Sequence, residues 1–284
     1  MRATLLLIVP AVSALRVAVL GGSGFVGSRV CRQLVDSGAD VKSISKSGAA
    51  PTWCAGEAWA SKVEWTACDL LRGARENIGT ALGDAEAIVS CVGAIGFDRQ
   101  ELLMGNGKAN VEAVNAAPAT VERYVLVSVA SEVEAARGWL PDFFAGYFDG
   151  KATAESTIAA AMADEGKSCH FVRPSFIYGG DRFGLFPPRV TYGYGSAIEE
   201  LLSAGPIGTL ADALPGLLKV ALRPPVSVDA VAGACAKAAL GEVSAEALDG
   251  TPEINAAAGA PAATGLSDLG KMLGERVEAL KGEA

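Results

Sequence analysis

The chain has 284 residues, of which 50% are hydrophobic and 20% are charged, and its formal net charge is −8. This amount of apolar sequence is enough to form a core and excludes a chain that is mainly disordered. The acidic balance, without a long basic run, argues against nucleic acid or an anionic membrane as the main partner, because both require clustered Lys and Arg. The length corresponds to about two domains, or to one α/β domain with an added lobe.

The cysteines and the single histidine form no pattern that binds metal or requires disulfides. No C-x-x-C is present, and a chain of this length needs no disulfide scaffold. His170 alone cannot complete a zinc site with isolated cysteines, so we expect no catalytic metal and a packing or surface role for this residue. We expect the six cysteines to be reduced and mostly buried: Cys31, Cys54, Cys68, Cys91, Cys169 and Cys235.

The first fourteen residues, MRATLLLIVPAVSA, resemble a short cleavable signal. One Arg precedes an apolar run from Leu5 to Val12, which is too short to span a bilayer. A signal of this kind leads to secretion or, in algae with complex plastids, starts plastid import; the alternative is a hydrophobic start that is not processed. No other stretch reaches eighteen uninterrupted apolar residues, so we expect no transmembrane span in the mature chain.

The rest of the chain alternates strand-like and helix-like segments, which predicts a parallel sheet covered by helices. Residues 179–216 are rich in Gly, Pro and aromatic residues without a sustained period, which is typical of a variable substrate lobe, and 256–264 is expected to be a loop. The predicted strands are 15–20, 41–45, 63–67, 87–92, 123–129 and 169–174. The predicted helices are 25–37, 106–117, 146–163, 226–240 and 266–280.

A glycine-rich turn follows the first predicted strand and opens the first predicted helix. Its sequence, GGSGFVG from Gly21 to Gly27, satisfies both G-x-x-G-x-x-G and G-x-G-x-x-G. The early glycines permit a tight turn and close approach of backbone N–H groups to a pyrophosphate, and Gly27 permits close packing of helix on strand. The helix N-terminus adds partial positive charge. In this position the motif indicates a dinucleotide site and a doubly wound Rossmann sheet of the α/β class, with Ser23, Gly24, Phe25 and Val26 as cofactor contacts.

The end of the second strand decides which dinucleotide fits. An NAD site requires an acid there for the ribose 2′-OH, about twenty residues after the turn. This chain has no acid there but has Ser45 and Lys46, which could hold a 2′-phosphate. We therefore favour NADP(H) over NAD(H). Asp69 and Leu70 end the third strand, where they could meet the adenine, and Val92 and Gly93 end the fourth.

A second motif, Y-x-x-x-K, is formed by Tyr147 and Lys151 on a predicted helix, where the two side chains share a face. A lysine ammonium beside a phenol favours the phenolate and can also hold the nicotinamide ribose. Such a tyrosine can pass a proton to a carbonyl oxygen during hydride transfer. The motif alone is weak, but its place between the fifth and sixth strands of a dinucleotide fold favours a catalytic role.

Together these residues resemble the extended-to-atypical branch of the short-chain dehydrogenase/reductase superfamily, over about residues 15–240. The resemblance points to a subgroup with the nucleotide-binding accessory subunit of respiratory complex I, a mitochondrial protein tied to coenzyme Q biosynthesis and a plant chloroplast homologue. It is carried by VAVLGGSGFVG, SCVG, NGKAN, GYFDGK and RPSFIYG. These residues imply a dinucleotide-binding domain at 15–178 and a small substrate lobe with closing helices at 179–284, after the signal at 1–14.

The resemblance implies roles for single residues. Gly21, Gly24 and Gly27 match the phosphate turn, and Asp69 matches the acid that contacts adenine. Tyr147 and Lys151 match the catalytic pair, and the stretch from Pro174 to Ile177 matches the one that passes the nicotinamide. The departure is at the end of the fifth strand, where active members carry Ser or Thr and this chain has Ala130. Ser128 or Ser131 could replace it. Loss of one such donor costs about 10²–10³ in rate, so we expect an intact cofactor site and an incomplete catalytic site.

Two functions remain open at this point. The first is an NADPH-dependent oxidoreductase linked to quinone or lipid metabolism in an organelle, mitochondrion or plastid, with a quinone or aromatic ketone as substrate. The second is a catalytically weak nucleotide-binding scaffold in a membrane-associated respiratory or coenzyme Q biosynthesis complex. A nucleotide-sugar epimerase or dehydratase is a smaller alternative, because no obvious basic pocket for a sugar diphosphate follows Gly179.

Overall fold

Seven parallel strands form the central sheet of the computed structural model, which describes residues 14–180 and 189–260. Their spatial order is β3-β2-β1-β4-β5-β6-β9, so the chain reverses direction across the sheet between β1 and β4. The predicted doubly wound α/β fold is therefore confirmed. The strands are β1 (Arg16–Leu20), β2 (Asp40–Ser45), β3 (Val63–Ala67), β4 (Ala87–Ser90), β5 (Arg123–Val127), β6 (Ser168–Arg173) and β9 (Ala247–Asp249).

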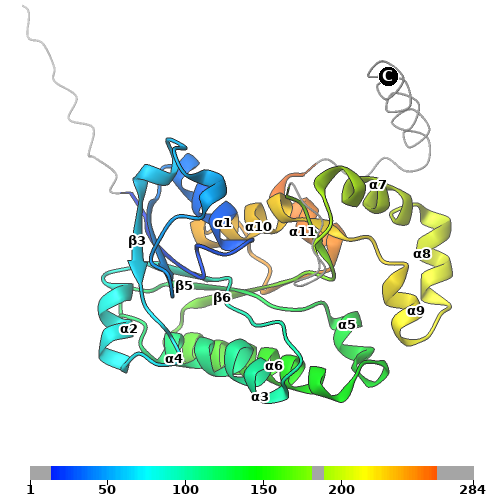
Figure 1. Cartoon of the computed structure of the whole chain (residues 1–284), viewed down its shortest axis with the longest axis horizontal. Coiled ribbons are helices and arrows are strands. Elements are labelled where there is room, and N and C mark those ends of the chain that lie inside the picture. The colour runs from blue at the N-terminus through cyan, green and yellow to red at the C-terminus, as the bar shows by residue number, and fades with distance from the viewer. Residues whose placement is uncertain (1–13, 181–188, 261–284) are drawn as a thin grey trace, which may run out of the picture.

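Helices cover both faces of this sheet (Figure 1). Alternate residues of β1 face opposite layers: Val17 and Val19 join one buried cluster with α1 and α10, and Ala18 and Leu20 join the other with α2, α4 and α6. Burial on both faces explains why the central strands β1, β4 and β5 read as nearly continuous apolar runs. The helices of these layers are α1 (Gly27–Asp36), α2 (Arg75–Leu82), α3 (Arg99–Leu103), α4 (Ala109–Asn115), α6 (Ala145–Asp164), α10 (Val228–Leu240) and α11 (Thr251–Ala258).

The remaining helices lie beyond the carboxyl ends of the strands, at the right of Figure 1. They are α5 (Ser131–Ala135), α7 (Tyr192–Leu202), α8 (Gly205–Asp212) and α9 (Gly216–Ala221). A separate two-stranded sheet pairs β7 (Ile177–Tyr178) with β8 (Val226–Ser227). Shorter turns are the 3-10 helices Thr52–Cys54, Ala60–Lys62, Arg137–Trp139 and Asp142–Phe144 and the π-helix Met104–Lys108.

All six predicted strands are present within a few residues of their expected bounds, but several other predictions were wrong. The segment expected to lack a period contains α7 and α8; these helices bury only Gly195 and Ala211, so their sequences carry little amphipathic signal. The predicted helix 226–240 begins as β8, the helix predicted at 106 begins as a π-helix, and the loop predicted from 256 continues α11 to Ala258. Strand β9 was missed because it has only three residues.

Two predictions fall outside the described residues: positions 1–13 of the signal and the helix at 266–280. Within residues 14–180 and 189–260, none of the helices combines the length and the apolar character needed to cross a bilayer.

Candidate functional site

A cavity of about 750 Å³ lies at the carboxyl ends of β1, β2, β3 and β4, beside the reversal in strand order. In open α/β sheets ligands bind in such a crevice. Its volume lies within the range of cofactor and small-molecule sites. Eight predicted cofactor residues line it: Gly21, Gly24, Ser45, Lys46, Asp69, Leu70, Val92 and Gly93.

The glycine turn has the geometry of a phosphate cradle. Gly21 has a φ of +73°, and its carbonyl accepts a hydrogen bond of 2.8 Å from the N–H of Gly24. A Cβ on Gly27 would lie 2.3 Å from the Gly21 oxygen, so only glycine fits there. No side chain caps α1, and within the described residues no backbone carbonyl accepts from the N–H groups of Phe25 and Val26. This uncapped helix end beside the cavity fits the phosphates of a dinucleotide.

Hydroxyl and cationic side chains meet where β2 ends. Ser45 Oγ lies 2.9 Å from Ser23 Oγ, and it accepts from the N–H of Gly48 at 3.1 Å. Lys46 is largely exposed, with its Nζ 3.9 Å from a carboxylate oxygen of Asp69. The adenosine end of the cavity thus presents serine hydroxyl groups, the Asp69 carboxylate and the largely exposed Lys46 ammonium.

Arg72 also lines this end of the cavity, and sequence reasoning missed it. It follows β3 by five residues, in the loop that leads to α2. Asp69 shapes that loop, because its Oδ1 accepts from the N–H of Leu71 at 2.9 Å. The only signal in the sequence was a basic residue close to Asp69, and this does not by itself indicate a ligand contact.

A buried amide network holds the loop after β4, which forms another wall of the cavity. The Asn106 side chain accepts from the N–H of Ala94 at 3.2 Å and donates to the Ala94 carbonyl at 3.0 Å and the Leu102 carbonyl at 2.8 Å. Asn110 donates to the Asn106 carbonyl at 2.8 Å and accepts from Ser90 at 2.5 Å. Both amides are fully buried, so they fix this loop rather than contact solvent. The NGKAN segment was the signal for these positioning residues.

Two glycines let α6 lie close to the start of α3 and to the turn that carries Asn106. A Cβ on Gly146 would lie 2.0 Å from the Arg99 carbonyl oxygen, and one on Gly150 would lie 2.9 Å from the backbone nitrogen of Gly107. The two glycines are four residues apart and therefore on one helix face. The residues that follow each of them, Tyr147 and Lys151, are thereby placed one helical turn apart on α6.

The Lys151 side chain reaches between the ends of β4 and β5. It is buried, and its Nζ donates to the Val127 carbonyl at 2.7 Å and to the Val92 carbonyl at 3.4 Å. Burial lowers the pKa of Lys151 to about 8, although Cys91 and Glu155 act in the opposite direction. The ammonium lies near Gly93, whose added Cβ would be 3.5 Å from Nζ. Lys151 thus lies directly behind the cavity wall.

Tyr147 differs from the expected lysine-tuned phenol. Burial raises the pKa of Tyr147 to about 12, and no nearby charge lowers it. Its ring packs edge-on against Phe148, with centroids 5.3 Å apart. The expected stabilisation of phenolate is absent because the Lys151 ammonium is directed to two backbone carbonyls. The phenol is consequently neutral at physiological pH.

The two candidate serines lie in different surroundings. Ser128 extends β5, and its hydroxyl is buried without a hydrogen-bond partner within the described residues. Because Tyr124 and Leu126 belong to the cluster with α6, alternation places Ser128 on the same face. Ser131 is exposed at the start of α5, where its N–H donates to Asp249 at 3.1 Å. Of the two, Ser128 is better placed to act with α6.

The remaining predicted contacts do not line the cavity. The Phe25 ring lies between the guanidinium groups of Arg29 and Arg189, at 4.8 Å and 4.6 Å from the ring centroid, and Val26 packs on the core. The Pro174 carbonyl accepts from the N–H of Ala130 at 3.0 Å, and Ile177 pairs with Val226 in the small sheet.

The cysteines and His170 are placed for packing. All six thiols are free, three of them fully buried. His170 is buried in β6, with its Nδ1 2.8 Å from the Ala245 carbonyl oxygen. Within the part of the chain that the structure describes, no group of three His, Cys, Asp or Glu side chains could hold a metal ion.

Comparison with known sequences adds to this geometry. A family described as NAD(P)H-binding matches residues 21–185. An uncharacterised chloroplastic protein of Arabidopsis thaliana is 38% identical over 175 residues, which are 61% of this chain and 54% of that protein. MIOREX complex component 2 of Saccharomyces cerevisiae is 34% identical over 82 residues, 28% of this chain and 29% of that protein. The chain thus spans about half the length, or less, of these curated relatives.

Solved structures with the same fold include nucleotide-sugar epimerases. The UDP-Glc/GlcNAc 4-epimerase of Campylobacter jejuni has a TM-score of 0.58 at 14% identity, covering 84% of this chain and 77% of that one. UDP-glucuronic acid 4-epimerase of Bacillus cereus, solved in complex with NAD, has a TM-score of 0.55 at 17% identity, with coverages of 83% and 78%. At these identities the likeness concerns the fold alone.

Proposed function

This chain belongs to the NAD(P)H-binding family and has the Rossmann fold of short-chain dehydrogenase/reductase-like proteins, and we propose that it is an NADPH-dependent reductase of a small carbonyl compound. The observation that carries the proposal is the cavity at the carboxyl ends of β1 to β4, with the uncapped start of α1 and Gly21, Gly24 and Gly93 in its wall. A quinone or an aromatic ketone is the proposed substrate.

The proposed preference for NADPH rests on the charges at the adenosine end. Lys46 and Arg72 line this end, and β2 ends in Ser45 without a carboxylate for a ribose 2′-OH. A 2′-phosphate would gain charge-assisted hydrogen bonds from these two cations.

Replacing Lys46 by glutamate tests this preference. Loss of one charge-assisted contact corresponds to roughly 1.5–3 kcal/mol, so we expect NADPH affinity to fall about tenfold to a hundredfold. NADH affinity should not fall, because a carboxylate at the end of β2 can accept from a ribose 2′-OH. Calorimetric titration of both nucleotides provides the measurement. Lys62→Glu makes the same charge change at an exposed site far from this cavity and should affect neither nucleotide. An equal loss of affinity for NADPH and NADH would show that Lys46 does not distinguish the two nucleotides.

The proposed chemistry assigns proton donation to Tyr147. When bound, a reduced nicotinamide supplies a hydride to the carbonyl carbon. The neutral Tyr147 phenol would donate a proton to the carbonyl oxygen, and its raised pKa keeps the phenol protonated at physiological pH. Lys151 would hold the cofactor ribose, and Ser128 or Ser131 would donate a hydrogen bond to the carbonyl oxygen in place of the usual residue at Ala130.

The Tyr147→Phe variant tests the proposed reductase directly. Removal of a general acid lowers turnover by about 10²–10⁴-fold. We expect a loss of this size in NADPH oxidation with a quinone or aromatic ketone, with NADPH affinity retained. Tyr192→Phe removes the hydroxyl of an exposed tyrosine that packs on Tyr178 and serves as the matched control. Unchanged turnover in Tyr147→Phe would exclude this residue as the proton donor.

The division of the chain and its location are also proposals. We assign nucleotide binding to 15–178 and the substrate lobe to 179–284, in which α7, α8 and α9 stand apart from the sheet while α10 and β9 complete it. We propose an organellar location, in a plastid or mitochondrion, and the name of the chloroplastic relative supports it. The name of the MIOREX complex component supports assembly into a larger complex.

A nucleotide-binding scaffold is the second candidate, and Ala130 favours it. The position at the end of β5 lacks a hydroxyl, and the Lys151 ammonium is engaged by backbone carbonyls. The scaffold predicts NADPH binding without turnover of any quinone or ketone, and no gain of turnover in Ala130→Ser. A reductase predicts turnover in the wild type and a higher rate when Ala130→Ser supplies the missing donor.

A further inference from the structure

A second cavity, of about 360 Å³, lies at the carboxyl ends of β5, β6 and β9. It shares no lining residue with the dinucleotide cavity. Its apolar walls come from α5, α9 and the start of α11, segments that are far apart in the sequence. The apolar residues that line it are Ala130, Val133, Val220, Pro224 and Pro252.

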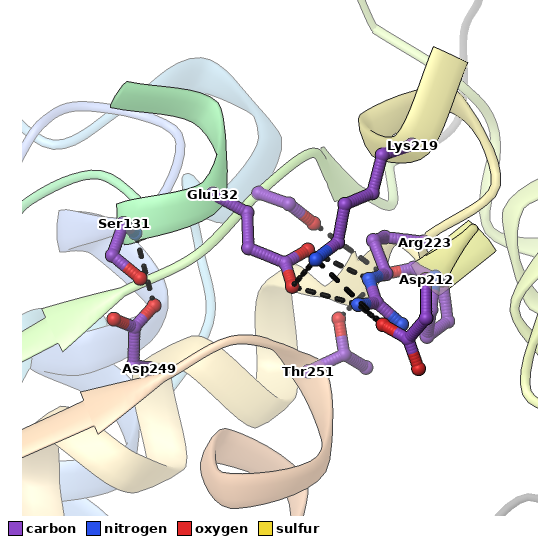
Figure 2. A network of polar contacts seen from close by, with 9 residues as sticks. Ser131, Glu132, Asp212, Lys219, Arg223, Asp249 and Thr251 are labelled. Carbon is purple, nitrogen blue, oxygen red and sulfur yellow. Dashed lines mark hydrogen bonds and ion pairs between the residues drawn. The ribbon is translucent and has the colours of Figure 1, made fainter. Parts of the chain in front are cut away.

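An ion cluster fixes two of these walls relative to each other (Figure 2). Glu132 on α5 accepts two hydrogen bonds from Arg223, at 2.6 Å and 2.7 Å, and Arg223 also donates to Asp212 of α8 at 2.7 Å. Lys219 of α9 lies 3.3 Å from Glu132. Such a bidentate pair fixes geometry as well as charge. The cavity is therefore a braced space between α5 and α9, not a gap that closes by side-chain collapse.

Polar groups on the rim are available to a ligand. The Ser131 hydroxyl and the Nη1 group of Arg223 have no hydrogen-bond partner within residues 14–180 and 189–260. The Thr251 hydroxyl donates to the Pro224 carbonyl at 2.6 Å and keeps its oxygen lone pairs free to accept. Figure 2 shows Ser131 and Arg223 on opposite sides of Thr251. The cavity thus presents donors at its rim and apolar surface between them.

The charged side chains in the lining disfavour an anionic ligand. Glu132 and Asp249 both line the cavity, and Arg223 lowers the pKa of Glu132, so that carboxyl is ionised. The single cation in the lining, Arg223, is already neutralised by Glu132 and Asp212. The cations at this site are already paired with carboxylates, so a phosphate or carboxylate would find no unpaired cation to neutralise it.

We propose that this cavity is a second ligand site, which binds a small uncharged molecule with an apolar body and a carbonyl or ether oxygen. The oxygen accepts from Ser131 or from Arg223, and the apolar body lies against Val133, Val220 and Pro252. This cavity shares no lining residue with the dinucleotide cavity, but Ser131 is also one of the two serines proposed above to bind the substrate carbonyl.

Fluorine NMR with 4-fluoroacetophenone as the probe tests this site on the full chain. We expect the wild type to broaden and shift the probe signal, with or without saturating NADPH. In Val220→Trp the larger side chain fills the cavity, and we expect affinity for the probe to fall at least tenfold. Leu218→Trp, two residues earlier on the same helix and exposed outside the cavity, is the matched control and should bind the probe as the wild type does.

Two further measurements test the polar contact and the charge of the ligand. Ser131→Ala should lower the affinity for the probe without changing the fold, because the Ser131 side chain is exposed. UDP-glucose, which carries a diphosphate, should fail to displace the probe. Binding that is unchanged in Val220→Trp, displacement by UDP-glucose, or no binding to the wild type would each overturn the proposal. NADPH titration of the same samples reports the dinucleotide cavity separately, so failure of one site is distinguishable from failure of the other.

Discussion

Replacing Gly27 by alanine is expected to abolish dinucleotide binding and to lower the free energy of unfolding by about 3 kcal/mol, the upper part of the range for overpacking a tight contact. The new Cβ would lie 2.3 Å from the Gly21 oxygen and 2.9 Å from the Gly22 Cα. All of these neighbours are backbone atoms, so the change can be accommodated only if the turn and the start of α1 separate. That separation would remove the N–H groups proposed to bind the phosphates.

The matched control for this change is Gly208→Ala. Gly208 is inside α8, and a Cβ there meets nothing within 4 Å. Alanine is favoured over glycine in a helix by up to about 1 kcal/mol, so this variant should be slightly more stable and bind NADPH normally. Urea unfolding and calorimetric titration of both variants give the comparison. Wild-type affinity in a folded Gly27→Ala protein would show that the turn does not hold the nucleotide.

The second large effect concerns Lys151 and pH. The pKa of this lysine is lowered from 10.5 to about 8 because its ammonium is buried. Between these two pH values the unfolded chain binds a proton that the native chain lacks, so this group's contribution to stability rises with pH. Below pH 8 the lysine is protonated in both the native and the unfolded chain. The native state then bears the full free-energy cost of burying the ammonium, which is about 3 kcal/mol from the size of the pKa shift.

The stability of Lys151→Met relative to the wild type measures this penalty. We expect the methionine variant's relative stability to be highest at pH 7 and to fall by about 3 kcal/mol as the pH approaches 10.5. Urea unfolding at pH 7, 8, 9 and 10 provides the free energies, and titrations of other groups cancel in the difference. Lys62→Met, at an exposed position, should give a flat difference. A flat difference for Lys151→Met would contradict the burial of a charged ammonium.

The parts of the fold that the sequence predicted are those with strong local patterns. The neighbouring strands β1 and β4 are buried on both faces, so their apolar runs are continuous. Helices α7, α8 and α9 gave no such pattern, because they bury almost nothing against the sheet. The π-helix before α4 departs from the helical period, and a periodicity argument cannot place such a departure.

The site residues also divide into those with a local sequence pattern, which could be predicted, and those that depend on tertiary structure. Gly21, Gly24 and Gly93 could be predicted because a glycine-rich turn follows β1 and a small residue follows β4, and all three line the cavity. Arg72 could not, because its role depends on where a loop returns in three dimensions. The NGKAN segment marked Asn106, but its hydrogen bonds to Ala94 depend on tertiary packing. The spacing of Tyr147 and Lys151 predicted a shared helix, but the direction of the ammonium toward Val127 depends on tertiary packing.

The most direct test of the central claim is calorimetric titration of the folded chain with NADPH and with NADH. The cavity between the glycine turn, Lys46 and Gly93 predicts binding of one nucleotide per chain, with NADPH the tighter of the two. At a hundred times its dissociation constant NADPH should also stabilise the fold by about 2.7 kcal/mol. Absence of heat and of stabilisation with both nucleotides, in a chain shown to be folded, would contradict a working dinucleotide site.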